Sequence, residues 1–325
     1  YDLPWGIKYN ANLGYVKVDH YSKDFKHAMY TYNPKTLERK NFSAYVSAKD
    51  WDNNAINYTF YNTLSWGKSF GGNHNFNVMV GTEYKRYDGK NFQAKKRDYF
   101  NNQLTALSVG STMEDISGGS SLELLFSYFG RITYDYKEKY LIDVTARYDG
   151  SSKFAPENRW GWFPSVSFGW NLGNEPFMED SGIDLKFRAS YGRTGNQEGI
   201  SPWAYHAKMS GGKNYGGQSG IAVSDFGNRN LRWEKADQYD VGFDLAFLKG
   251  KVNMIFDIYQ KNPFDLLYNK PVAAHTGTTS TLSNIGSIRN RGVEFTLNTH
   301  FNFGKHFSWL SQFNISHNKN IIKSL

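Results

Sequence analysis

The sequence contains no cysteine among its 325 residues, only 8 prolines, and no run of 18 or more apolar residues. Without cysteine it can form no disulfide bond, thiolate nucleophile or cysteine metal site. A membrane-spanning helix needs about 20 consecutive, mostly apolar residues, and none is encoded here. These absences exclude a disulfide-stabilised secreted domain and a helical membrane protein. They leave open a cytosolic protein, or a sheet that is closed into a barrel by backbone hydrogen bonds.

Sequence motifs of common catalytic centres are also missing. The sequence has no GxxxxGK[ST] phosphate loop, no GxSxG nucleophile turn and no HExxH zinc motif. Its 8 histidines are scattered, without a pair at metal-ligand spacing. The acid pairs Glu114-Asp115 and Glu179-Asp180 lie beside glycine or serine, which is typical of solvated loops. We therefore predict no enzymatic activity, no cofactor and no metal site.

The formal net charge is +8, from 38 Lys and Arg against 30 Asp and Glu. A basic balance favours nucleic-acid binding when the basic residues cluster. Here they are spread along the chain, and the one tight cluster, Lys95-Lys96-Arg97, is assigned to a polar connection. We therefore predict no nucleic-acid partner. The sequence opens on Tyr1-Asp2-Leu3-Pro4 without a signal peptide, as expected of a segment from a larger or processed protein.

Aromatic residues make up 17% of the chain and 31 residues are glycine, a composition typical of strands and turns. Near Val144, and again near Phe187, apolar residues alternate with polar or charged ones such as Asp143 and Arg188. A β-barrel strand faces lipid at only every second residue, so a low mean hydropathy is compatible with a membrane barrel. We predict that Val144 and Phe187 face lipid, while Asp143 and Arg188 face the lumen.

The same alternation recurs in segments that are often longer than the roughly five or six residues usual in soluble sheets. Their length matches the roughly 9–11 residues that cross a bilayer at a tilt. Apolar faces often end in rings, as at Tyr58 and Trp66 or Tyr128 and Tyr136, where aromatic girdles are expected. A large soluble β-protein such as a propeller is the alternative, but no repeat of about 40 residues is apparent. The further alternating segments are 241–247, 252–258, 293–301 and 307–315.

From Tyr58 onward, the predicted connections alternate between short and long. The short ones are Gly67–His74, Lys137–Lys139, Lys249–Lys251 and Gly304-Lys305. The long ones are Asp88–Ser121, Asp149–Arg159, Gly195–Leu231 and Asn262–Ser287. Asn171–Ile183 is a longer member of the short set, with a helical turn predicted at Glu175–Glu179. Short turns on one side and long loops on the other are typical of an up-and-down barrel.

Before Tyr58, strands are predicted near Ile7–Val18, Phe25–Tyr32 and Phe42–Lys49. The whole chain then has about thirteen strands. Bacterial single-chain barrels close with an even number, and an open sheet would leave backbone groups unpaired in lipid. We therefore predict an all-β, antiparallel up-and-down transmembrane β-barrel, of which residues 1–325 are one part and to which strands are missing at one or both ends.

Several stretches are similar, in order and spacing, to one family of outer-membrane proteins. They are Leu125–Lys137, Arg147–Phe154, Arg159–Ser167, Leu185–Gln197, Leu231–Glu234, Asn284–Gly286, Asn290–Glu294 and Asn314–Asn320. On these motifs, which lie between roughly Trp66 and Leu325, the chain resembles the SusC/RagA family of TonB-dependent transporters. Turn formers such as Asp149-Gly150 suit the points where strands leave the membrane. Most of these motifs are interpreted as architectural and none as catalytic.

The resemblance implies a barrel of about 22 strands, an N-terminal plug domain and a TonB-contacting segment. It also implies a Bacteroides-type outer-membrane location, a SusD-like lipoprotein over the extracellular mouth, and import of oligosaccharides or peptides. No plug domain is found in residues 1–325. Two alternatives stay open: a siderophore or cobalamin TonB-dependent receptor without a lipoprotein lid, and a soluble β-rich adhesin or binding protein.

Ligand contacts are expected in the long loops and on the lumen face. Trp203, Tyr205, Tyr215 and Phe226 are the aromatic residues singled out in the longest predicted loop, and such rings could stack on sugars. They could equally pack the loop on itself or against the lipoprotein. We take these four as the candidate ligand-binding residues.

Overall fold

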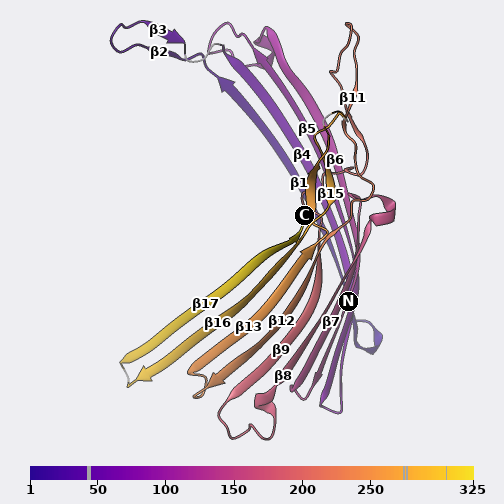
Figure 1. Cartoon of the computed structure of the whole chain (residues 1–325), viewed down its shortest axis with the longest axis vertical. Helices are drawn as coiled ribbons and strands as arrows, with labels where there is room; N and C mark the ends of the chain where they lie inside the picture. Colours follow the sequence, from indigo (N-terminus) through magenta and orange to yellow (C-terminus); the bar gives the residue numbers. More distant parts are fainter. Residues whose placement is uncertain (42–44, 274, 276, 305) are drawn as a thin grey trace. The chain divides into compact units, whose positions relative to one another are not determined.

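The chain folds into strands, and the computed structural model describes residues 1–41, 45–273, 275, 277–304 and 306–325. The long strands are β1 (Ile7–Lys26), β4 (Ser47–Phe70), β5 (His74–Arg97), β6 (Thr112–Tyr136), β7 (Tyr140–Ser151), β8 (Trp160–Asn171), β9 (Asp184–Asn196), β12 (Glu234–Phe247), β13 (Val252–Phe264), β16 (Ser287–Phe303) and β17 (Phe307–Ser324). These eleven form one antiparallel sheet in that order, each hydrogen-bonded to the next (Figure 1). This is the predicted up-and-down topology.

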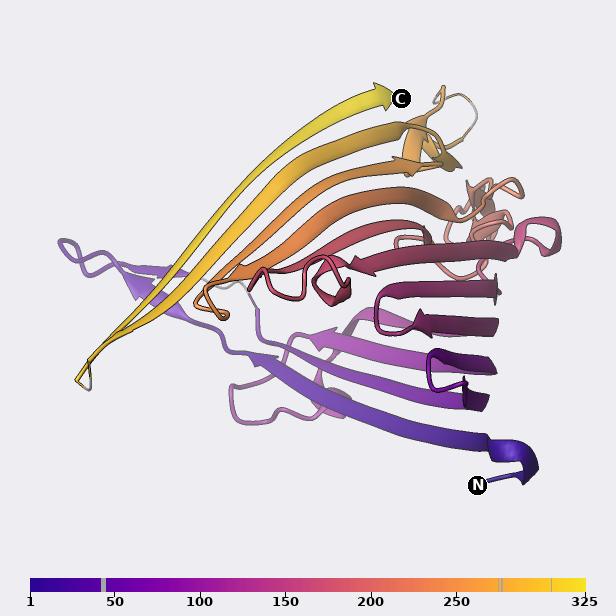
Figure 2. The same ribbon diagram turned by 90° about the horizontal axis from the view of Figure 1, so that it is seen from below.

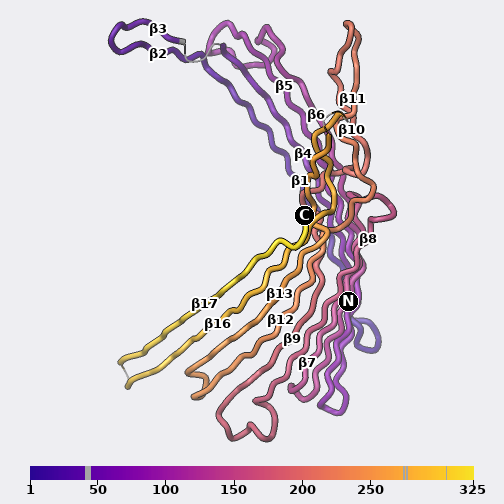
Figure 3. Tube along the Cα trace, viewed as in Figure 1, coloured from indigo at the N-terminus to yellow at the C-terminus, as the bar shows by residue number. Residues whose placement is uncertain are grey.

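Six shorter strands form three hairpins in the connections, which the tube in Figure 3 traces. They are β2 (Tyr30–Tyr32) with β3 (Arg39–Asn41), β10 (Lys208–Ser210) with β11 (Ala222–Asp225), and β14 (Leu267–Pro271) with β15 (Ser280–Asn284). The helices of the described residues are 3₁₀ turns: η1 (Pro4–Gly6), η2 (Leu107–Val109), η3 (Pro156–Asn158) and η4 (Leu172–Asn174). None of these helices is long and apolar enough to span a membrane.

The chain divides into two compact units. Unit 1 comprises Tyr1–Asn12, Tyr61–Glu83 and Leu125–Leu325, and unit 2 comprises Leu13–Phe60 and Tyr84–Leu124. In unit 1, the long strands β7, β8, β9, β12, β13, β16 and β17 follow one another as a single curved layer (Figure 2). Unit 2 has a small core of its own, in which the buried residues Val46, Ala48 and Tyr99 pack against Phe25 and Leu107.

The two faces of the unit 1 sheet differ in chemistry, as the alternation predicts. Directly opposite residues of paired strands share a face. Through β7, β8 and β9 the register carries one face from Val144 to Phe187 and the other from Asp143 to Arg188. Both apolar side chains are exposed, whereas both charged ones form ion pairs. The predicted division into an apolar and a charged face is confirmed.

Aromatic rings lie at both ends of the apolar face of β7. Tyr140 stacks on Trp170 with ring centroids 6.1 Å apart, and Tyr148 stacks on Trp160 at 4.7 Å. The strand from Tyr140 to Tyr148 has nine residues. A tilted strand of an outer-membrane barrel crosses the bilayer with roughly 9–11 residues, between aromatic girdles at both interfaces. The spacing of the rings therefore fits one bilayer crossing, with Val144 midway.

The predicted short turns appear at 71–73, 137–139 and 248–251. The predicted turn Gly304-Lys305 includes Lys305, which lies outside the described residues. Between β8 and β9 the 3₁₀ helix is η4. At the predicted helical turn Glu175–Glu179 the chain forms a hydrogen-bonded turn, in which Met178 donates its backbone N–H to the Glu175 carbonyl. The long connections of unit 1 are 152–159, 197–233 and 265–286.

The long connection predicted at Asp88–Ser121 is present but shorter, at residues 98–111, because β5 continues to Arg97 and β6 begins at Thr112. These strand ends are polar and glycine-rich on both faces, so they show no alternation.

The predicted strand Phe25–Tyr32 is wrong, since β1 runs to Lys26 and β2 starts a separate hairpin. Part of the predicted strand Phe42–Lys49, residues 42–44, lies outside the described residues. The large sheet consequently has eleven strands rather than about thirteen.

Candidate ligand and partner site

The three long connections of unit 1 share one hydrophobic core. Phe154 comes from 152–159, Ile200 and Leu231 come from 197–233, and Trp233 lies where that connection ends. Phe154 and Leu231 are fully buried, and the Phe154 ring lies 5.1 Å from that of Trp233. Leu282 of β15 packs against the same core. We call this set of packed connections the loop cluster.

Polar contacts tie the loop cluster together around its core. Arg229 pairs with Glu157 at 3.0 Å, which joins connection 197–233 to connection 152–159. Arg232 pairs with Asp265 at 2.7 Å and its guanidinium thereby joins 197–233 to 265–286. The hydrogen bond to Asp265 raises the pKa of Arg232, which stays charged. Each connection is therefore held to another by both apolar packing and a charged pair.

The four predicted aromatic residues occupy different environments. Tyr205 is only 8% exposed and packs on His206, with ring centroids 4.1 Å apart. Trp203 lies near the same histidine, is 45% exposed and has a φ of 63°. Tyr215 is 91% exposed at the tip of the β10–β11 hairpin, and Phe226 is half-exposed. The structure thus brings Trp203 and Tyr205 together around His206. Tyr205 packs within its own loop, which is the alternative to ligand contact that the sequence analysis leaves open.

The β10–β11 hairpin presents exposed apolar residues that the sequence analysis did not single out. Met209 is directly opposite Val223, so these two share a face, and Ile221 comes directly before β11. All three are exposed. The strands have three and four residues, which is too short for an alternation pattern to reveal them. The only sequence signal is the glycine-rich tip between them.

Arg188 anchors a charged network on the lumen-type face of unit 1. Its guanidinium binds Asp244 and Asp257, each at 2.9 Å. Gly242 makes room for this arrangement, because a Cβ there would lie 2.0 Å from Oδ1 of Asp257. Charge-assisted pairs of this kind are stronger than neutral hydrogen bonds. The network therefore fixes the relative positions of β9, β12 and β13 on this face.

A second arginine, Arg147 of β7, lies on the same face of the sheet. It binds Glu83 at 2.5 Å and Asp149 at 2.7 Å, and also donates to the Ser127 hydroxyl. Among the described residues, no group of three His, Cys, Asp or Glu is placed to hold a metal ion. Beside the Arg188 network lies a hollow whose polar lining residues include Asn75, Asn77, Thr133, Asp135, Asp143, Ser167, Lys186, Arg188, Ser190 and Asp240.

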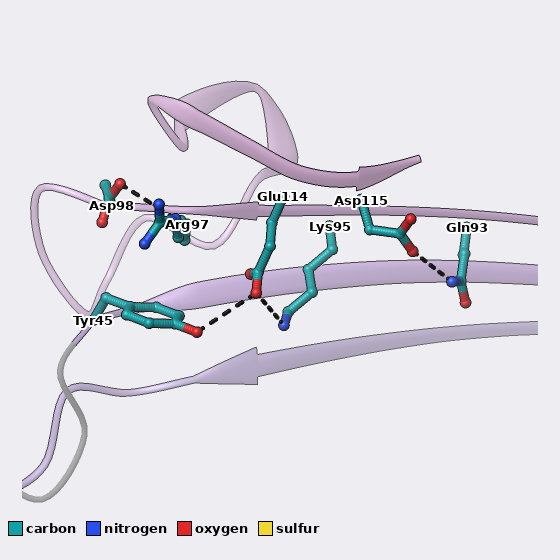
Figure 4. A network of polar contacts seen from close by, with 7 residues as sticks. All are labelled: Tyr45, Gln93, Lys95, Arg97, Asp98, Glu114 and Asp115. Carbon is teal, nitrogen blue, oxygen red and sulfur yellow. Dashed lines mark hydrogen bonds and ion pairs between the residues drawn. The ribbon is translucent and has the colours of Figure 1, made fainter. Parts of the chain in front are cut away.

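A further polar network links β5 and β6 in unit 2 (Figure 4). Lys95 donates to Glu114 at 2.9 Å, and Gln93 donates to Asp115 at 2.6 Å. The Tyr45 hydroxyl also reaches Glu114, at 3.5 Å. The sequence predicts a solvated loop for both acids, but they lie in β6 and are paired. The basic cluster that begins at Lys95 likewise lies at the end of a strand.

Glu175 ties two connections together at the end of unit 1 where the short turns lie, which we call the turn end. Its carboxylate accepts hydrogen bonds from Lys139 Nζ at 3.0 Å, the Tyr140 hydroxyl at 2.8 Å and Trp170 Nε1 at 3.2 Å. Donation by Lys139 is the main reason that the pKa of Glu175 is lowered. The β8–β9 connection is therefore held against the β6–β7 turn.

Substituting Glu175→Gln should lower the melting temperature of the full-length protein by more at pH 7 than at pH 3. A lowered folded pKa stabilises the protein above the unfolded pKa of about 4.3, and this gain is lost as pH falls through the folded pKa. Circular dichroism during heating measures it at both pH values. Glu179→Gln, in the same connection and exposed, is the control. An equal deficit at pH 7 and pH 3 would contradict the pairing.

Residues 1–322 match the family model described as TonB dependent receptor-like, beta-barrel. TonB-dependent receptor P3 of Formosa agariphila is 36% identical over 275 residues, which are 82% of this chain and 27% of that receptor. TonB-dependent receptor SusC of Bacteroides thetaiotaomicron is 32% identical over 282 residues, which are 83% of this chain and 27% of that protein. The chain thus spans about a quarter of the length of these relatives.

The structural comparison agrees with the sequence comparison. The RagAB peptide importer in its closed-closed state superposes with a TM-score of 0.88 at 25% identity, over 99% of this chain and 35% of that chain. The resemblance to SusC and RagA proteins is confirmed by relatives found from both sequence and structure. The chain therefore belongs to the TonB-dependent receptor β-barrel family, in its SusC/RagA branch, and is part of an outer-membrane β-barrel.

Proposed function

We propose that this chain is the barrel part of an importer that takes up oligosaccharides or peptides, works with a SusD-like surface lipoprotein and is energised through TonB. The likeness to the RagAB peptide importer carries the proposal, because it extends over 99% of the chain and so includes the long connections. In this proposal residues 1–325 form one part of a single barrel domain and have no catalytic activity.

The loop cluster supports the proposal by its construction. Its core and charged pairs give a rigid base, and Trp203, Tyr215 and Phe226 remain exposed on it. Preorganised aromatic residues can contact a ligand or partner at a small entropic cost. We therefore assign these three residues to contact with cargo or with the lipoprotein. Tyr205 is assigned a supporting role, because its ring is buried.

Replacing Gly211–Gly220 with the turn dipeptide Asn-Gly in the full-length protein should leave the barrel assembled, because loop tips tolerate change. Uptake, or co-purification of the lipoprotein, should fall several-fold, since Tyr215 and the hairpin tip are removed. Tyr215→Ala separates the ring from the rest of the tip. Growth on the imported nutrient and affinity purification measure the two effects.

Normal uptake together with normal lipoprotein association would remove the hairpin tip from the site. The transport proposal as a whole has a separate test. Uptake that persists after deletion of the entire gene, in a strain without a redundant importer, would overturn it.

A further inference from the structure

The connection between β8 and β9 is the longest described turn at the turn end, and it is the crimson loop at the bottom of Figure 1. Glu175 within it binds the Tyr140 hydroxyl and Trp170 Nε1. Both rings lie on the apolar face, because Tyr140 and Trp170 alternate in register with Val144 and Val166. Glu175 therefore ties the connection to rings of the lipid-facing side, while Gly173 and Asn174 line a hollow with Lys186 and Asp244 of the charged side.

Phe177 follows Glu175 by two residues and is 70% exposed. A two-residue step spans at most about 7 Å, so Phe177 is held close to the level of the stacked rings. Rings at this level of a barrel lie at the headgroup boundary of the bilayer. An isolated exposed phenylalanine in water is common and needs no explanation. At this position, however, the two rings bound by Glu175 lie on the lipid-facing side of the sheet.

Two lysines of the adjacent turn complete this surface. Lys139 is paired with Glu175, and the Lys137 ammonium lies 5.4 Å from the Tyr136 ring centroid. Lysines near the ends of membrane-crossing elements extend to the headgroups while their methylene stems cover apolar surface. In outer-membrane barrels the short turns lie on the periplasmic side. The neighbouring lipid headgroups are therefore those of the periplasmic leaflet.

We propose that the connection 172–183 is an interfacial lipid site, which inserts Phe177 among the phospholipids of the periplasmic leaflet and places Lys137 beside their phosphates. Glu175 is the positioning residue, because it joins the connection to the lipid-facing rings. The site would fix the depth of this edge of the barrel in the bilayer. The proposal rests on the outer-membrane location and not on the transport proposal, so the two can fail separately.

Site-specific photocrosslinking of the full-length protein in cells tests the proposal. The photoreactive residue p-benzoylphenylalanine is placed at Phe177, at Val144 as the lipid-facing reference, and at Tyr215 as the aqueous reference. After illumination, mass spectrometry should find phospholipid adducts at 177 in a yield comparable to that at 144. At 215 such adducts should be at least several-fold rarer. The heat-dependent gel shift of folded barrels confirms that each variant assembles.

A second variant tests the role of Glu175. Glu175→Ala should reduce the phospholipid adduct at 177 several-fold and leave that at 144 unchanged, because the connection is released while the strands stay paired. Adducts at 177 only to protein, or no adduct there while 144 reacts, would overturn the lipid site. An undiminished adduct in the Glu175→Ala background would overturn the positioning role.

Discussion

Val144→Arg should prevent most of the protein from reaching its folded state in the outer membrane. Val144 lies midway between the rings of Tyr140 and Tyr148, on the apolar face. An arginine on the lipid face near the bilayer midplane costs about 2–4 kcal/mol. This loss is a large part of the net stability of a typical domain. The fraction of protein that shows the heat-dependent gel shift in outer-membrane preparations measures the effect.

Two changes on the opposite face provide matched controls. Asp143→Asn keeps an acceptor for Arg131 and should have a small effect. Ser167→Arg introduces the same charge as Val144→Arg, but into the polar hollow of the charged face. Both variants should fold in nearly normal amounts. Equal loss of folded protein in Val144→Arg and Ser167→Arg would show that the two faces are wrongly assigned.

Phe154→Ala should loosen the loop cluster while leaving the barrel folded. The Phe154 side chain is 0% exposed and packs on Trp233. Phenylalanine-to-alanine changes in packed cores cost about 3–5 kcal/mol. Of the buried residues of this core, Phe163 lies in β8 and the others lie in the connections, so the loss should fall mainly on the connections. We expect cleavage within residues 197–233 by protease added to intact cells to become at least tenfold faster.

Phe226→Ala is the control, because this residue is half-exposed in the same connection. It should change the cleavage rate little. Association with the lipoprotein should fall with Phe154→Ala if the cluster acts as a rigid base. Unchanged protease resistance in Phe154→Ala would mean that the connections are held by other contacts than this core.

The strands of unit 1 could be predicted because lipid imposes a strict pattern on them. Around Val144 and Phe187 every second residue must be apolar, and the alternation is visible without any structure. β5 and β6 have 24 and 25 residues, more than twice the roughly 9–11 that a crossing requires. Nothing selects for apolar residues in the surplus, where Gly118 and Gly119 lie. The sequence pattern therefore predicts a loop at these strand ends.

The site was only partly predictable for a different reason. A loop aromatic residue is easy to find in a sequence, but its burial depends on residues that are distant along the chain. Tyr205 is buried within a connection that packs on Phe154, about fifty residues earlier. The exposed face of Met209 and Val223 depends on a strand-pairing register that no periodicity in the sequence reveals. Such facts come only from tertiary structure.

The shared core of the three long connections of unit 1 also determines how they can move. Separate surface loops fluctuate independently, on times from nanoseconds to microseconds. Here, displacing one connection exposes apolar surface on the other two and breaks the pairs Arg229–Glu157 or Arg232–Asp265. Opening is therefore cooperative: the connections shift as one body, on the microsecond-to-millisecond scale of collective motions. A molecule that touches any one of them biases all three.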